Sequence, residues 1–297
     1  MSAPRWEKGP DAPTARTEVA AAVLNGKIYV IGGFTRLLGA SRMVEMFDPK
    51  SQTWETRAKL PVALHHTSAV AFNGRIYVLG GFKGRFSWTP SEQVFAYDPE
   101  TDQWSAKRDM PTARGALGAG ISGGRIFAVG GLGRSRDGLV NTGANEVYDP
   151  ASDRWEVKAP LPTPRDHLAV AAVNGRIHAV GGRLGSNFAQ NLADHHQYDP
   201  DKNTWVLLKP LPRARSGTAA AVLKGRLHVF GGEGPKGTFS DHDVYDPETG
   251  RWATAPPLPT ARHGLGAAVI GNRIYVLSGG PKPGGSYSGA NEIFLAD

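Results

Sequence analysis

Five arginines occupy the same position of a repeating pattern in this sequence. Arg16, Arg114, Arg165, Arg215 and Arg262 each lie three residues after a proline, and Leu64 takes that place after Pro61. A guanidinium offers planar, forked donors that match a carboxylate, sulfate or phosphate group. A recurring arginine can equally donate to backbone carbonyls of its own or the next repeat. The pattern therefore predicts either an anion site or a repeated structural contact.

Groups that can move protons follow the same position. The candidate catalytic residues, should the protein be an enzyme, are His65, His263, His167, Asp166 and Glu18. Histidine titrates closest to neutral pH and is therefore the preferred acid or base among them. The candidate ligand-binding residues are the five arginines together with His65, His66 and Trp88.

Two regular spacings predict the elements that carry these residues. The second glycine of a Gly-Gly pair, or of Ser-Gly in the last copy, stands at positions 33, 81, 131, 182, 232 and 279. Six tryptophans repeat with the same separations, namely Trp6, Trp54, Trp104, Trp155, Trp205 and Trp252. An Asn-Gly dipeptide before the glycine pair, as at Asn73, predicts a β-hairpin. A period near 50 residues with four short strands is typical of a propeller blade.

The succession of Gly-Gly, Tyr-Asp-Pro and Trp resembles the kelch motif, and the resemblance covers essentially the whole chain in six copies. It implies an all-β, six-bladed kelch-type β-propeller that forms a single domain, residues 1–297. The expected blades are residues 14–56, 62–106, 112–157, 163–207, 213–254 and 260–297 with 1–8. Because Trp6 has no strands before it, we expect the N-terminal stretch to complete the last blade as its outer strand and close the ring.

All variation in repeat length falls between the glycine pair and the next Asp-Pro. These loops should share one face with the arginine loops, and variable loops on a rigid scaffold are the first candidates for function. Their basic residues are Arg36, Arg42, Lys83, Arg85, Arg134, Arg136, Arg183, Lys236 and Lys282, against few acids such as Asp137, Asp194 and Glu233. Trp88, outside the repeat spacing, predicts a pocket wall or, with Phe82 and Phe86, a small core that holds its loop.

Composition excludes several kinds of chemistry. The chain has 34 Lys and Arg against 27 Asp and Glu, a net charge of +7, and no cysteine. The absence of cysteine excludes disulfides, thiolate metal sites and the Cys–Tyr cofactor of galactose-oxidase-like proteins. His195, His196 and His242 lie near acids but lack zinc-ligand spacing, so we expect neither a metal nor a cofactor. With no secretory leader or spanning run, we expect a cytoplasmic monomer without a membrane partner; a removed leader would make it periplasmic or secreted.

Two functions are consistent with these residues. The first is a recognition module whose Arg-rich channel mouth binds an anionic small molecule or an acidic peptide or protein. The alternative is an isomerase of the mutarotase or epimerase kind, or a lyase, acting on an anionic sugar such as a sialic acid. Six-bladed kelch enzymes that interconvert sialic acid anomers imply this alternative. A pI near 9.6 permits nucleic-acid binding, but no nucleic-acid motif is present, so we do not expect that partner.

Overall fold

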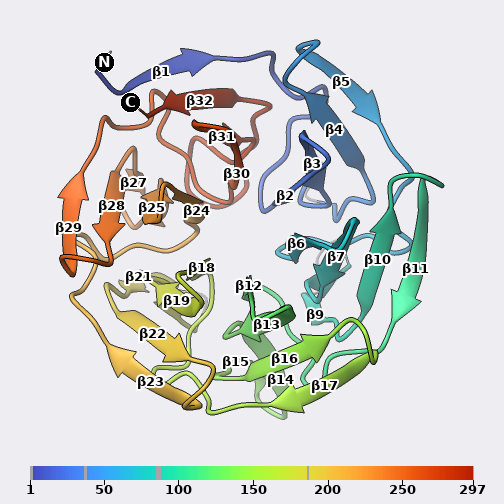
Figure 1. The fold of residues 1–297 in the computed structure, drawn as a ribbon, viewed down its shortest axis with the longest axis vertical. Helices are drawn as coiled ribbons and strands as arrows, with labels where there is room; N and C mark the ends of the chain where they lie inside the picture. Colours follow the sequence, from blue (N-terminus) through green and yellow to red (C-terminus); the bar gives the residue numbers. More distant parts are fainter. Residues whose placement is uncertain (1–2, 37–38, 85–87, 186, 297) are drawn as a thin grey trace.

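The protein is a closed ring of β-sheets (Figure 1). The inner strands of the ring line a central channel. The computed structural model describes residues 3–36, 39–84, 88–185 and 187–296. These residues form six four-stranded antiparallel sheets, arranged as the blades of a propeller. The predicted six-bladed kelch-type fold is therefore confirmed.

The blades follow one another in chain order. Blade 1 contains β2 (Ala20–Leu24), β3 (Lys27–Ile31), β4 (Val44–Asp48) and β5 (Thr53–Thr56). Blade 2 contains β6 (Ser68–Phe72), β7 (Arg75–Leu79), β10 (Val94–Asp98) and β11 (Gln103–Lys107). Blade 3 contains β12 (Gly118–Ser122), β13 (Arg125–Val129), β16 (Asn145–Asp149) and β17 (Arg154–Val157). In each blade the first strand lines the channel and the fourth lies on the outer rim.

The second half of the ring repeats this order. Blade 4 contains β18 (Ala169–Val173), β19 (Arg176–Val180), β22 (His195–Asp199) and β23 (Thr204–Leu207). Blade 5 contains β24 (Ala219–Leu223), β25 (Arg226–Phe230), β28 (His242–Asp246) and β29 (Arg251–Thr254). Blade 6 contains β30 (Gly266–Ile270), β31 (Arg273–Leu277), β32 (Asn291–Leu295) and β1 (Arg5–Lys8).

The N-terminal strand closes the ring. β1 pairs antiparallel with β32, with Trp6 opposite Phe294. The indole N–H of Trp6 donates to the carbonyl of Pro256 in blade 5 at 2.9 Å. Figure 1 shows the two ends of the chain side by side at this blade. The predicted closure by an N-terminal outer strand is confirmed.

The other repeat tryptophans join neighbouring blades in the same way. Each indole N–H donates to a carbonyl just beyond the outer strand of the preceding blade, at 2.8–2.9 Å: Trp54 to Pro10, Trp104 to Ala58, Trp155 to Arg108, Trp205 to Ala159 and Trp252 to Lys209. The hydrophobic core also lies between blades, because each of six buried clusters takes its residues from two adjacent blades. Each repeat of about 50 residues therefore supplies one blade and one set of contacts to the neighbouring blade.

Glycine allows the close approach that ends the second strand. Asn73 and Gly74 both have positive φ, 46° and 72°, as the predicted tight turn between β6 and β7 requires. At Gly81, where φ is 105°, a Cβ would lie 2.9 Å from the carbonyl oxygen of His65. The glycine pair thus lets the loop before the first strand of the same blade, which contains the repeat position of the arginines, lie against the end of the second strand.

Four short hairpins extend the variable loops. They pair β8 (Phe82–Lys83) with β9 (Thr89–Pro90), β14 (Leu132–Ser135) with β15 (Gly138–Asn141), β20 (Arg183–Leu184) with β21 (Asn187–Asn191), and β26 (Glu233–Gly234) with β27 (Gly237–Thr238). Among the described residues there is no helix with the length and apolar character needed to cross a membrane.

Candidate functional site at the channel mouth

The two loop classes meet at one mouth of the channel. Isolated antiparallel bridges join the residue after each arginine position to the residue after the glycine pair: Thr17 to Phe34, His65 to Phe82, Gly115 to Leu132, Asp166 to Arg183, Ser216 to Glu233 and His263 to Gly280. These twelve positions therefore build the mouth, and both loop classes share a face as the strand alternation predicts.

A ring of backbone hydrogen bonds narrows the channel here. Six equivalent residues, all with positive φ, form this backbone belt: Glu18, His66, Ala116, His167, Gly217 and Gly264. From His66 onward each amide N–H donates to the carbonyl of the belt residue before it, at 2.8–3.1 Å. The N–H of Val19 donates to the carbonyl of Gly264 at 3.4 Å and completes the ring. The belt holds the side chains of three blades, Glu18, His66 and His167, at the neck of the channel.

The five repeat arginines do not reach the mouth, which corrects the expectation that they bind a ligand there. Arg16, Arg114, Arg165, Arg215 and Arg262 are all 0% exposed. Each guanidinium points into its own blade, where it donates to backbone carbonyls of the same blade. Burial lowers the pKa of Arg114, and Glu146 opposes that shift. The repeated structural contact, rather than an anion site, explains this pattern.

Acids on the third strands complete these contacts. Arg114 Nη1 lies 2.6 Å from Glu146 Oε2, and the pairs Arg16–Glu45, Arg215–Asp243 and Arg262–Glu292 each lie at 2.8 Å. In blade 2, where Leu64 replaces the arginine, Phe95 stands at the position of the acid, and both belong to one buried apolar cluster. Blade 2 thus replaces both the arginine and the acid by apolar residues, whereas blade 4 keeps Arg165 but has His196 at the position of the acid.

One half of the mouth is ionic. Arg183, 4% exposed, donates from Nη1 to Glu233 at 2.6 Å and from Nη2 to Nε2 of His167 at 2.7 Å. Because Arg183 can only donate, the proton of neutral His167 is on Nδ1, which donates to Asp166. Burial raises the pKa of Asp166, but the hydrogen bonds from His167 and Asn141 and the charge of Arg183 outweigh it and keep the pKa below its usual value.

Glu18 links two further histidines to this network. Its Oε2 lies 3.3 Å from His66 Nε2, and its Oε1 lies 3.5 Å from His263 Nε2. His263 Nε2 also lies 3.6 Å from Oε2 of Glu233. Four of the candidate catalytic residues, Glu18, Asp166, His167 and His263, are thus brought into one mouth network with Arg183 and Glu233. Burial lowers the pKa of His66 well below its usual value, so His66 is neutral at neutral pH.

The opposite half of the mouth is aromatic. His65 stacks on Phe34 with ring centroids 3.9 Å apart, and Trp88 packs against both Phe82 and His66. Burial lowers the pKa of His65 to about 3, so this imidazole is a poor proton acceptor. Phe82 and Trp88 form a small core with Leu132 of blade 3. Arg85 and Phe86 lie outside the described residues.

Sequence reasoning missed the importance of Arg183 and Glu233. Both were counted among the loop charges, yet each is buried directly after a glycine pair, where the bridge to the arginine loop turns it toward the channel. The position after the second glycine, compared across the six repeats, was the available signal: it reads Phe34, Phe82, Leu132, Arg183, Glu233 and Gly280.

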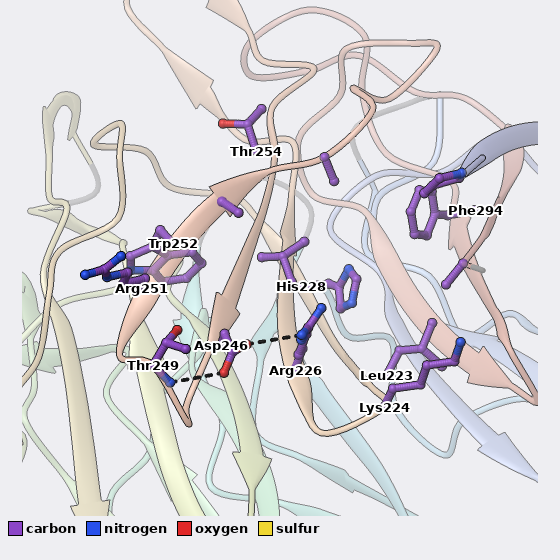
Figure 2. A pocket seen from close by; sticks show the side chains of 15 residues that line it. Leu223, Lys224, Arg226, His228, Asp246, Thr249, Arg251, Trp252, Thr254 and Phe294 are labelled. Atoms are coloured by element: carbon purple, nitrogen blue, oxygen red, sulfur yellow. Dashed lines mark hydrogen bonds and ion pairs between the residues drawn. The ribbon is translucent and has the colours of Figure 1, made fainter. Parts of the chain in front are cut away.

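Three of the cavities lined by the described residues bear on the size of a possible ligand. The channel between the inner strands measures about 390 Å³, and the neck beside Glu18, His66 and His167 about 90 Å³. A third cavity of about 500 Å³ lies at the seam between blade 5 and blade 6, near the other face (Figure 2). In that groove Arg226 pairs with Asp246 at 3.2 Å. None of the predicted site residues lines it.

The fold and the repeat contacts define a kelch-type propeller. The family model described as the KLHDC2/KLHL20/DRC7 Kelch-repeats domain matches residues 2–182 and 147–280, and the chain belongs to this Kelch-repeat family. The kelch propeller fold supports a binding or recognition module.

Individual relatives show the same repeats. A putative F-box/kelch-repeat protein of Arabidopsis thaliana is 48% identical over 48 residues, and mouse Kelch-like protein 1 is 40% identical over 47. Each alignment covers 16% of this chain, and it spans only 13% and 6% of those proteins. The solved structure of YjhT superimposes with a TM-score of 0.81 at 16% identity over 97% of both chains, which shows the shared fold.

Proposed function

We propose that the loop face is a recognition surface for an anionic partner, such as an acidic peptide segment of another protein. The observation that carries the proposal is the charge of the variable loops. Their cationic residues outside the mouth network, called here the rim cations, are Arg36, Arg42, Lys83, Arg134, Arg136, Lys236 and Lys282. Lys83 is half-buried and the other six are exposed, whereas Asp137 is the exposed acid among the described residues of these loops.

Because the repeat arginines are buried, an anion would bind at the rim rather than to them. The charge of the loop face stays positive. The rim cations lie on five of the six blades around the mouth. Their fields therefore add and attract an acidic segment from a distance of about a Debye length, roughly 8 Å at physiological salt. Trp88, half-buried at the aromatic side of the mouth, offers an apolar contact within the same surface.

The second candidate is the isomerase or lyase acting on an anionic sugar. Its supporting observation is the mouth network, in which His167, Asp166 and Glu18 offer groups for proton transfer beside the neck. The neck measures about 90 Å³, whereas pockets for small molecules usually measure about 300–1,000 Å³. This small volume favours recognition at the rim over catalysis on a sugar enclosed in the neck.

Binding of a fluorescein-labelled deca-glutamate peptide, followed by anisotropy at two salt concentrations, tests the proposal. Replacing Arg134, Arg136 and Lys236 by serine should weaken binding several-fold, because each exposed ion pair contributes about 0.2–1 kcal/mol. The matched control replaces Lys50, Lys224 and Arg226, which lie on the opposite face, by serine. Absence of peptide binding, or an equal loss in both variants, would contradict recognition by the loop face.

A further inference from the structure

Three electron-rich side-chain atoms converge at the mouth from three different blades. Glu18 Oε1 lies 3.5 Å and Glu233 Oε2 lies 3.6 Å from Nε2 of His263. The three ligand atoms lie within 4.8 Å of one another. Both buried residues are nearly inaccessible: His263 is 1% exposed and Glu233 is 2% exposed.

The other nitrogen of His263 shows which atom faces the carboxylates. Nδ1 lies 3.1 Å from the carbonyl oxygen of Gly280, and a carbonyl only accepts, so Nδ1 carries the proton of the neutral ring. Nε2 then presents its lone pair to two carboxylate oxygens. Such an arrangement is unfavourable unless a positive charge lies between the three atoms, either a proton on Nε2 or a bound metal ion. Oε2 of Glu233 also accepts from the backbone N–H of Gly284 at 3.1 Å.

The spacing fits a metal ion of ordinary size. With bonds of about 2.1 Å to nitrogen and oxygen, a tetrahedral Zn²⁺ site separates its ligand atoms by about 3.4 Å. The observed separations of 3.5 and 3.6 Å from the imidazole nitrogen are close to that value and too long for direct hydrogen bonds. Two of the three separations are thus near the spacing that a bound ion would need, and the third, between the carboxylate oxygens, is at most 4.8 Å.

Neighbouring groups hold these ligands in place as they do around known metals. The bond from His263 Nδ1 to the Gly280 carbonyl is the usual support of a ligating histidine. Arg183 fixes the other oxygen of Glu233 at 2.6 Å, and Asp166 neutralises Arg183 at 3.3 Å. With neutral imidazoles, the three carboxylates of Glu18, Glu233 and Asp166 and the guanidinium of Arg183 leave two negative charges, which favours a bound cation.

Glycines make the room for this cluster. A Cβ at Gly264 would lie 2.6 Å from Oε1 of Glu18, and one at Gly280 would lie 2.7 Å from the ring of His263. Gly264 also belongs to the backbone belt with a φ of 59°. A larger residue at Gly264 would meet Glu18 and Thr17 at 2.6 Å, and one at Gly280 would meet Ser286 before it met His263 at 2.7 Å.

From this geometry we propose that Glu18, Glu233 and His263 bind a divalent transition-metal ion of the Zn²⁺ or Mn²⁺ class. One imidazole and two carboxylates suit these ions. Three protein ligands leave a coordination position free, and Glu18 also borders the neck of the channel. The site goes beyond the proposed recognition surface, since it uses none of the rim cations.

Isothermal titration of Zn²⁺ and Mn²⁺ into protein dialysed against a chelator tests the site. Wild type should bind one ion, and Glu18→Gln and Glu233→Gln should each weaken binding by at least about tenfold. Co²⁺ in place of Zn²⁺ should give visible absorption bands of a low-symmetry site that both variants lose. Glu248→Gln, the same exchange at an exposed position on the opposite face, is the control and should bind as wild type does.

The variants separate the possible outcomes. Glu233→Gln leaves Arg183 without one partner, so its fold is checked by circular dichroism; Glu18→Gln keeps that ion pair and provides the test if Glu233→Gln unfolds. Binding that persists in Glu18→Gln would place the ion elsewhere and overturn the proposal. Failure of wild type to bind either ion would also overturn it and would leave a proton on His263 as the cation that joins the two carboxylates.

Discussion

Each buried arginine is tied to its blade by contacts that water cannot replace. Arg114 donates to the carbonyls of Thr112 and Ala128 and pairs with Glu146, all at 3.0 Å or less. Removing one member of such a pair leaves the other charge buried and uncompensated, which usually costs about 3–5 kcal/mol. The Leu64 and Phe95 pair of blade 2 shows that an apolar pair can occupy the same place.

Arg114→Leu alone should therefore lower the free energy of unfolding by about 3–5 kcal/mol. Adding Glu146→Phe, which copies blade 2, should recover a large part of that loss, because apolar replacement of a whole buried pair is often close to neutral. Urea denaturation of wild type, both single variants and the double variant gives the coupling energy. Arg125→Leu, at a partly exposed ion pair, is the control. A fully stable Arg114→Leu would contradict the structural role.

The loop that carries each of these arginines was predictable from sequence. Whether the guanidinium points into the blade or toward the channel mouth was not. Spacing after Pro111 locates Arg114 in the loop, whereas its burial depends on Glu146, 32 residues later. The joint exchange of arginine for Leu64 and of the acid for Phe95 was the signal that could have shown it. The cluster of Glu18, Glu233 and His263 has no local motif, because its members come from blades 1, 5 and 6 and meet only in the closed ring.

At the scale of single elements, blades 4 and 5 contain an unusual pairing of strands through histidines. His178 on β19 contacts His195 on β22 at 2.8 Å, and His228 on β25 contacts His242 on β28 at 2.9 Å. Burial lowers the pKa of His178 to about 4, and burial together with the charge of His178 lowers that of His195 to about 3. Both pKa values lie below the value of about 6.5 expected for the unfolded chain.

Acid should therefore destabilise these blades. Between about pH 6.5 and pH 4 the unfolded chain binds protons that the folded histidines do not, so stability is present above pH 6.5 and falls as the pH decreases. His178→Tyr with His195→Val copies Tyr77 and Val94 of blade 2 and should flatten this part of the profile. Melting temperature against pH, measured by calorimetry for both proteins, checks it. Parallel profiles would show that the histidine pair does not titrate on unfolding.

At the scale of the whole molecule, stability depends on joining the two ends of the chain. β1 supplies the hydrogen-bonding partner of β32 and the indole of Trp6, which packs on Phe230 of blade 5 and Phe294 of blade 6. The regular spacing of Trp and Gly-Gly made this architecture predictable, because each of the six repeats supplies one blade and the leftover Trp6 must complete the last one. The variable loops have no such regularity, and their charges had to be placed by the structure.

Deleting residues 1–8 should lower the melting temperature and cause aggregation that increases with protein concentration, because β32 becomes an unpaired edge. A synthetic peptide of residues 1–9 added to the truncated protein should restore part of the stability by strand addition. Deleting residues 1–3 keeps β1 and is the control. Light scattering and thermal melts measure both effects, and a truncated protein as soluble and stable as wild type would show that closure by β1 is dispensable.

The pairing of β1 with β32 also determines when the ring can close during translation. Arg5 pairs with Leu295, which is made 290 residues later. At about 5–20 residues per second, a ribosome needs roughly 15–60 s to cover that distance. During this interval the first strand has left the ribosome while its partner does not yet exist. Closure of the ring between blade 6 and β1 is therefore a late event that waits until translation is nearly complete.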